Sequence, residues 1–138
     1  MNSEVPNYYT SLLPFRELFA QGNPILTYHK IGRRPVRTKL KGLYVSAELF
    51  RRQLEELRAA GFTSGALEDC SGAQERRLVI TFDDGYVNVL ENAVAPLADM
   101  KFKAVQFLVA DLVGKNNAWD LPRGEAPEPL MDAAQIRD

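Results

Sequence analysis

An apolar run at residues 78–82 is the strongest pattern in the chain, and it is followed at once by sequence with helical spacing. A run of this kind is typical of a central parallel strand that is buried on both faces. Beyond it, Val87, Leu90, Val94 and Leu97 recur at the period of a helix. The loop between the two elements is therefore expected at the carboxyl edge of a parallel sheet, where ligands bind.

The segment after Ser46 carries the clearest helical pattern. Ser46 can cap the start of this helix, and Gly61 can end it. Phe50, Leu54 and Leu57 form an apolar stripe, whereas charged residues cover the opposite, solvated face. The segment is therefore predicted to be an amphipathic helix.

The remaining elements follow from the same patterns. Strands are expected near 25–31, 62–67, 78–82 and 103–109, and helices near 47–60, 86–100 and 130–137. Pro96 should kink the helix near 86–100 or divide it into two pieces. Residues 64–76 and 114–129 are predicted to be loops.

Two adjacent carboxylates, Asp83 and Asp84, directly follow the central strand. They are costly to place together unless something offsets their repulsion and desolvation, and a metal ion is the usual partner. Neighbouring side chains on an extended backbone point in opposite directions, so the two carboxylates are expected to have different roles. Asp84-Gly85 could instead be a simple hairpin turn, but the helical sequence that follows favours a functional loop.

Composition narrows the classes of function. The chain has 138 residues, a net charge of −1 and a single cysteine, Cys70, so it cannot form an internal disulfide. Residues 1–23 lack the features of a signal peptide or a membrane span, and they are predicted to form a short helix packed on the domain. A cytoplasmic location without membrane contact is therefore expected. The basic stretch from Lys30 to Lys41 is interpreted as a solvated rim loop, and nucleic-acid binding is not expected.

Several segments, in order along the chain, resemble the polysaccharide deacetylases, also called carbohydrate esterase family four or the NodB-homology domain. Residues 78–86, LVITFDDGY, resemble the first motif of that family. Further similarity lies at residues 25–31 (ILTYHKI), 45–54, 60–62, 102–109, 113–114 and 119–120. The resemblance covers about residues 24–138, which are interpreted as a partial deacetylase domain preceded by an extension at 1–23.

The resemblance implies a fold, a reaction and residue roles. The fold would be an α/β, distorted (β/α) barrel, of which this chain forms only the amino-terminal portion. The reaction would be hydrolysis of N-acetyl or O-acetyl groups on a polysaccharide or oligosaccharide. Asp83 takes the position of the general base, and Asp84 that of a ligand to a divalent metal, commonly zinc. The metal would polarise the acetyl carbonyl while a carboxylate removes the proton from water.

The chain departs from the family pattern at the metal site. The family holds its metal with one aspartate and two histidines of a later H-x-x-x-H motif, whereas this chain has a single histidine, His29, upstream of the aspartates. One carboxylate does not make a zinc site. The chain is therefore interpreted as an amino-terminal portion that is inactive alone and binds metal poorly. Its incomplete barrel should leave an exposed sheet edge, through which copies could associate.

Two residues and one alternative function stay open at this point. His29 could bind substrate or assist proton transfer near Asp83, or it could merely form a hydrogen bond at a strand end. Trp119 could stack on a sugar ring or fill the core. The chain could also be a non-catalytic remnant of the same fold that binds a glycan or a partner.

Overall fold

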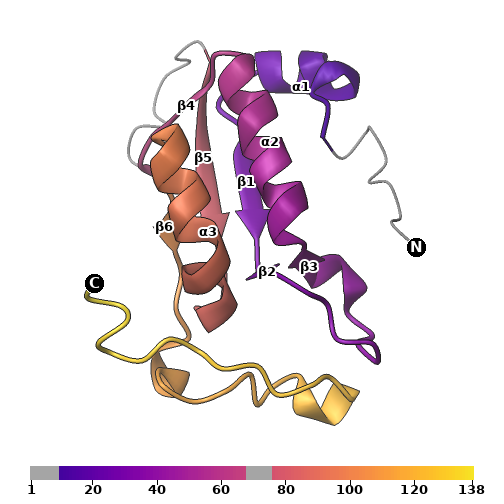
Figure 1. Ribbon diagram of the computed structural model, residues 1–138, viewed down its shortest axis with the longest axis vertical. Helices are drawn as coiled ribbons and strands as arrows, with labels where there is room; N and C mark the ends of the chain where they lie inside the picture. Colours follow the sequence, from indigo (N-terminus) through magenta and orange to yellow (C-terminus); the bar gives the residue numbers. More distant parts are fainter. Residues whose placement is uncertain (1–9, 68–75) are drawn as a thin grey trace.

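The computed structural model describes residues 10–67 and 76–138 (Figure 1). Cys70 and parts of the predicted extension and of the loop at 64–76 lie outside the described residues. The extension contributes a 3₁₀ turn, η2 (Leu13–Phe15), and the short helix α1 (Arg16–Ala20). The ring of Phe19 in α1 contacts that of Phe62, with the centroids 5.6 Å apart, so α1 packs on the domain as predicted.

A four-stranded parallel sheet forms the centre of the structure, with β5 (Arg77–Phe82) in its middle. β1 (Ile25–Tyr28) pairs with β5 along its length, while β4 (Thr63–Ser64) pairs with the start of β5 and β6 (Val105–Gln106) with its end. The parallel sheet confirms the predicted α/β class. A second, two-stranded parallel sheet joins β2 (Lys30–Ile31) to β3 (Tyr44–Val45), and the sequence pattern did not reveal β3.

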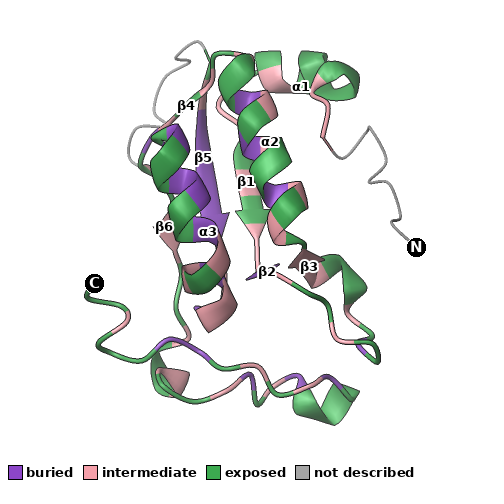
Figure 2. Ribbon diagram, viewed as in Figure 1, coloured by how far each residue is buried: buried purple, intermediate pink, exposed green. Residues whose placement is uncertain are grey.

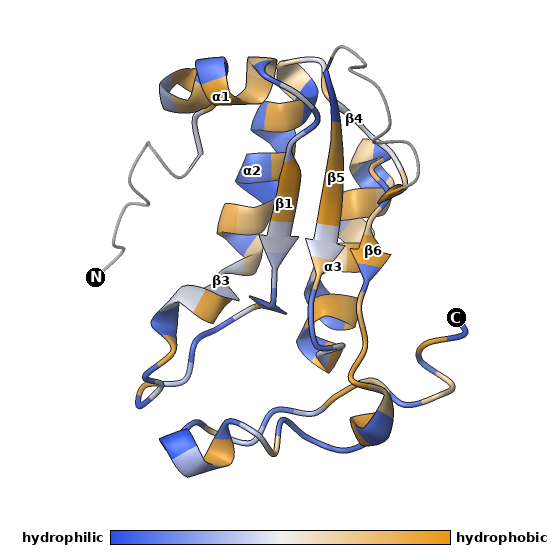
Figure 3. Ribbon diagram, turned by 180° about the vertical axis from the view of Figure 1, so that it is seen from behind, coloured by the Kyte–Doolittle hydropathy of each residue, from blue (hydrophilic) through white to orange (hydrophobic). Residues whose placement is uncertain are grey.

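Two long helices, α2 (Ala47–Ala59) and α3 (Val87–Met100), cover one face of the sheet (Figures 1 and 2). Their buried faces and the sheet enclose the core, which includes Phe50, Leu54, Ile80, Phe82 and Ala93. The view from behind shows the other face of β1 and β5 without a covering helix in the described part of the chain (Figure 3). Short 3₁₀ turns complete the structure: η3 (Lys41–Leu43), η5 (Ala110–Leu112) and η6 (Leu121–Arg123).

The ends of α2 form as predicted. The Ser46 hydroxyl accepts a hydrogen bond from the backbone N–H of Leu49 at 3.1 Å and caps the first turn. At the other end, Gly61 has φ of +82°, and the N–H of Phe62 donates to the carbonyl of Leu57 at 3.0 Å. This is the Schellman arrangement, in which a left-handed residue lets the chain satisfy the last carbonyls of the helix.

One alternative predicted for Pro96 and one predicted helix are wrong. Pro96 does not divide α3, which is one helix of 14 residues. A kink, the other alternative, stays a prediction. Residues 133–137 form turns rather than a helix. They begin at a capping box, in which the Asp132 carboxylate accepts from the N–H of Gln135 at 2.9 Å and the Gln135 side chain accepts from the N–H of Asp132 at 3.0 Å.

Candidate active site

The parallel pairing of β1 with β5 brings His29 and Asp83 together at the carboxyl end of the sheet. Tyr28 lies opposite Phe82 in the register, and the N–H of Asp83 donates to the carbonyl of Tyr28 at 2.9 Å. The next residues along both strands therefore emerge side by side. His29 Nε2 lies 3.7 Å from Asp83 Oδ2, and the two side chains are 30% and 35% exposed. Water and a substrate can reach this pair.

Asp84 has different surroundings from its neighbour. Its backbone is in the left-handed region with φ of +73°, and Gly85 follows with φ of +81°. Burial raises the pKa of the Asp84 carboxyl, as do the charges of Asp83 and Asp120, whereas His29 and Lys30 oppose the rise. The positive φ of Gly85 favours glycine at this position, and a Cβ there would also displace the Leu108 side chain, whose Cδ2 would lie 2.8 Å away.

Lys30, the first residue of the basic stretch, was predicted to lie in a solvated loop. This prediction is wrong, because Lys30 lies beneath the turn at Asp84 and Gly85. Its side chain is fully buried. The Nζ atom lies 4.7 Å from the ring centroid of Tyr44 and 4.5 Å from that of Tyr86. It also lies 3.3 Å from the Tyr44 hydroxyl, which donates to Glu128 at 2.8 Å. Lys30 directly follows His29 and Tyr86 follows Gly85, so this contact joins the two loops that carry the candidate site.

Residues 113–131, called the rim segment below, cross the carboxyl end of the sheet. Trp119 and Asp120 lie on this segment. Trp119 is half-buried against the core, and its ring centroid lies 6.4 Å from that of Tyr86. Asp120 is buried; its Oδ1 accepts from Arg123 at 3.4 Å, whereas Oδ2 has no hydrogen-bond partner within the described ranges. Asp120 and Lys30 were not predicted as site residues, because nothing in the local sequence pattern signals that either is buried.

The rim segment is held in place by main-chain and carboxylate hydrogen bonds. The N–H of Met131 donates to the carbonyl of Gly85 at 2.8 Å, directly beside the aspartates. Farther along, Glu125 accepts from the N–H groups of Lys39 at 2.6 Å and Leu40 at 2.8 Å, and from the hydroxyl of Thr38. The hydrogen bond from that hydroxyl is the main cause that lowers the pKa of the Glu125 carboxyl. These contacts join the loop after β2 to the rim of the site.

The residues at this edge do not by themselves form a complete metal centre. In residues 10–67 and 76–138, no three His, Cys, Asp or Glu side chains are grouped so that they could hold a metal ion. Asp84 offers a carboxylate, and His29 already faces Asp83. A zinc site normally has three or four protein ligands, so the described donors do not fit a full zinc site.

A family model described as polysaccharide deacetylase matches residues 71–135, which include the central strand, both aspartates and α3. This part of the chain is similar to the polysaccharide deacetylase family. The match excludes His29, which lies between β1 and β2, and includes Trp119. A comparison with curated protein sequences gives no match.

Solved structures of deacetylases share the fold of this chain. IcaB from Ammonifex degensii is similar with a TM-score of 0.68 and 21% identity, over 84% of this chain and 47% of that one. A polysaccharide deacetylase from Bacillus cereus is similar with a TM-score of 0.64 and 28% identity, over 86% of this chain and 35% of that one. The deacetylase PplD from Streptococcus pyogenes is similar with a TM-score of 0.61 and 21% identity, over 83% of this chain and 50% of that one.

These likenesses confirm the predicted fold, an α/β, partial (β/α) barrel of the polysaccharide deacetylase type. The chain spans from about a third to half of the length of these structures. The roles of Asp83, Asp84, His29 and Trp119 stay predictions, because a shared fold does not assign them. Among the described residues, no helix is both long enough and apolar enough to cross a membrane.

Proposed function

We propose that the chain supplies part of the active site of a metal-dependent polysaccharide deacetylase, which hydrolyses N-acetyl or O-acetyl groups on a carbohydrate. The observation that carries the proposal is the position of Asp83. Its carboxylate lies at the carboxyl end of the central strand, 3.7 Å from His29 and open to solvent, in a chain similar to the deacetylase family. A general base needs such a position, because it must reach both water and substrate.

Asp83 is proposed to take a proton from the attacking water. The water oxygen forms a bond to the acetyl carbon, and the bond from that carbon to the sugar nitrogen breaks. The amine leaves with the proton that was taken from the water, and the acetyl group leaves as acetate. His29 orients the Asp83 carboxylate and leaves one of its oxygens for the water. Trp119 lies on the rim near Tyr86, where its exposed part could contact a sugar ring.

Asp84 is proposed as the carboxylate that this chain gives to a divalent ion, zinc by family resemblance. Its raised pKa is the expected property of a half-buried carboxylate whose charge is not yet offset by a cation. Because the described donors do not fit a complete metal site, we propose that the 138-residue chain alone does not catalyse deacetylation.

A chimera tests this function. Residues 1–138 would be joined to the part of the Bacillus cereus deacetylase that this chain does not cover, and acetate release from an N-acetylated oligosaccharide would be measured. We expect turnover by the chimera and none by the chain alone. Asp83→Asn should lower kcat by a factor of 100 or more, on the order of the contribution of a general base, and should leave zinc binding intact.

Asp84→Ala in the same chimera provides the matched comparison. It should lose bound zinc together with activity, because it removes a ligand rather than the base. Equal loss of zinc in both aspartate variants would refute the proposed division of roles. A folded chimera that binds zinc and has no activity on any acetylated glycan would refute the proposed reaction.

A further inference from the structure

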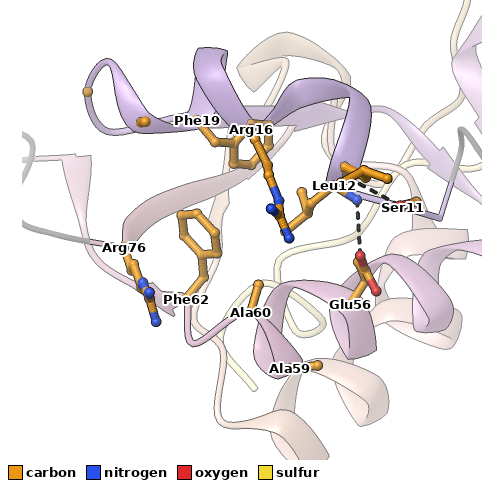
Figure 4. Close-up of a pocket in the computed structure, with 12 residues that line it drawn as sticks. Ser11, Leu12, Arg16, Phe19, Glu56, Ala59, Ala60, Phe62 and Arg76 are labelled. Carbon is orange, nitrogen blue, oxygen red and sulfur yellow. Dashed lines mark hydrogen bonds between the residues drawn. The ribbon is translucent and has the colours of Figure 1, made fainter.

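A hollow of about 1130 Å³ lies at the end of the sheet opposite to the aspartates (Figure 4). It is enclosed by the η2–α1 segment, the carboxyl end of α2 and the residue before β5. Because β5 runs from Arg77 to Phe82 and a strand rises by about 3.3 Å per residue, the hollow lies roughly 20 Å from Asp83. It therefore does not belong to the candidate active site.

The wall of the hollow is largely apolar. Phe19 and Phe62 meet edge to face there, with ring planes at 84°, and Leu12, Ala59 and Ala60 extend the same surface. Figure 4 shows these side chains around the opening. A wall of this composition can cover the hydrocarbon part of a ligand.

Two arginines add charge to this apolar wall. Arg16 extends from α1 and Arg76 precedes β5, and in Figure 4 the ring of Phe62 lies between their guanidinium groups. Both side chains are exposed, and within the described residues neither has a hydrogen-bond or ion-pair partner. Arg76 Nη1 would lie 3.0 Å from a Cβ at Gly61, so this guanidinium lies directly over the end of α2.

The acidic residue that lines the hollow, Glu56, is already engaged. Its Oε1 atom accepts a hydrogen bond from the N–H of Leu12 at 3.1 Å, which ties the extension to α2. In Figure 4, Glu56 lies on the far side of Arg16 from Phe62 and Arg76. The positive charge of the hollow therefore comes from Arg16 and Arg76, on either side of the Phe62 ring.

We propose that this hollow binds an amphipathic anion, whose carboxylate or phosphate head lies at the edge of the Phe62 ring, where the exposed Arg16 and Arg76 side chains turn towards it from either side. A guanidinium presents a planar fork of N–H donors that matches the oxygens of either head group. The apolar chain of the ligand would lie along Phe19, Phe62 and Ala60. This site is separate from the proposed deacetylase site and does not depend on it.

Calorimetric titration of the full chain with decanoate, below its micelle concentration, tests the proposal. We expect saturable one-to-one binding of decanoate or of decyl phosphate, and the tighter of the two identifies the head group. Decyltrimethylammonium has the same chain length with a cationic head and should not bind. Equal binding of the cation would overturn the proposal, and so would the absence of binding by both anions.

Variants locate the site. Arg16→Gln and Arg76→Gln should each weaken binding about tenfold, as expected for the loss of a charge-assisted hydrogen bond. Ala60→Leu should also weaken binding, because the larger side chain fills the hollow. Arg34→Gln changes an exposed arginine in a distant loop and should have no effect. Binding that is unchanged in the Arg16/Arg76 double variant would contradict the proposal.

Discussion

Two adjacent carboxylates at the end of β5 differ in environment although they are neighbours in the chain. Asp83 faces His29 and solvent, whereas Asp84 is half-buried in the left-handed region with φ of +73°. The alternation of side chains along a strand was enough to predict that the two would differ. It could not predict the left-handed backbone of Asp84, because strand alternation describes extended residues only.

Asp84→Asn should stabilise the chain at neutral pH. Because the folded state raises the pKa of Asp84, it binds the proton more tightly than the unfolded state does, and stability falls as pH rises through the acid range. Asparagine removes the charge and adopts positive φ readily. The expected gain in the free energy of unfolding is below about 1 kcal/mol, because Asp84 keeps contact with solvent.

Urea unfolding at neutral and at acid pH measures this effect. The gain should be present at neutral pH and should shrink in acid, where Asp84 is already protonated. Asp99→Asn is the matched control, and it should give no such gain because Asp99 is an exposed carboxylate at the far end of α3. A lower stability of Asp84→Asn than of the original chain at neutral pH would show that the charge of Asp84 is well compensated in the fold.

Lys30 shows what the sequence could not reveal at the scale of single residues. In the sequence it is the first of several basic residues that are interrupted by Gly32 and Pro35, a pattern that is typical of a solvated loop. In the structure Tyr44 and Tyr86 enclose its ammonium group, and both come from segments distant in sequence. Only the tertiary arrangement places these rings around it, so no local pattern could indicate the burial of Lys30.

At the scale of elements, the long, regular segments followed the sequence closely, whereas the two-residue strands β2, β4 and β6 were predicted only as parts of longer strands and β3 was not predicted. The capped, amphipathic pattern of α2 predicted both of its ends because the capping residues lie in the sequence itself. β2 and β3 have two residues each, too few for any periodicity. The segment at 133–137 has a capping box, yet it forms turns.

Lys101→Gly should stabilise the chain by about 1 kcal/mol. Lys101 ends α3 in the left-handed region with φ of +59°, and the N–H of Phe102 donates to the carbonyl of Leu97 at 2.9 Å. This is the position at which glycine carries no penalty from a Cβ atom. Thermal and urea unfolding would measure the gain.

Lys101→Ala is the matched control for this substitution. It removes the same charge but keeps a Cβ atom, so it should leave the strain in place and give little or no gain. If alanine and glycine stabilise the chain equally, the charge of Lys101 rather than its backbone conformation is the cause, and the argument about strain is wrong.

At the scale of the whole molecule, helices cover one face of the sheet, and β1 forms an edge of it (Figures 1 and 3). Ile25 in β1 is 53% exposed. We propose that copies of the chain associate through this edge. Ile25→Lys should then shift the population towards the monomer in sedimentation velocity, because a lysine on an edge strand opposes pairing with another strand.

Val36→Lys is the control for the association, since Val36 is 95% exposed in a loop away from the edge. It adds the same charge and should leave the association unchanged. The proposal fails if the original chain is monomeric at high concentration, or if both lysine variants reduce association equally.

The central claim is that this chain carries Asp84 as a metal ligand without a complete metal site. Calorimetric titration of the 138-residue chain with zinc, with Asp84→Ala as the control, tests it most directly. The account predicts no tight binding that depends on Asp84, because the described residues do not provide the three or four ligands of a zinc site. Tight binding that is lost in Asp84→Ala would contradict it, and His29 or a second copy would then have to supply the missing ligands.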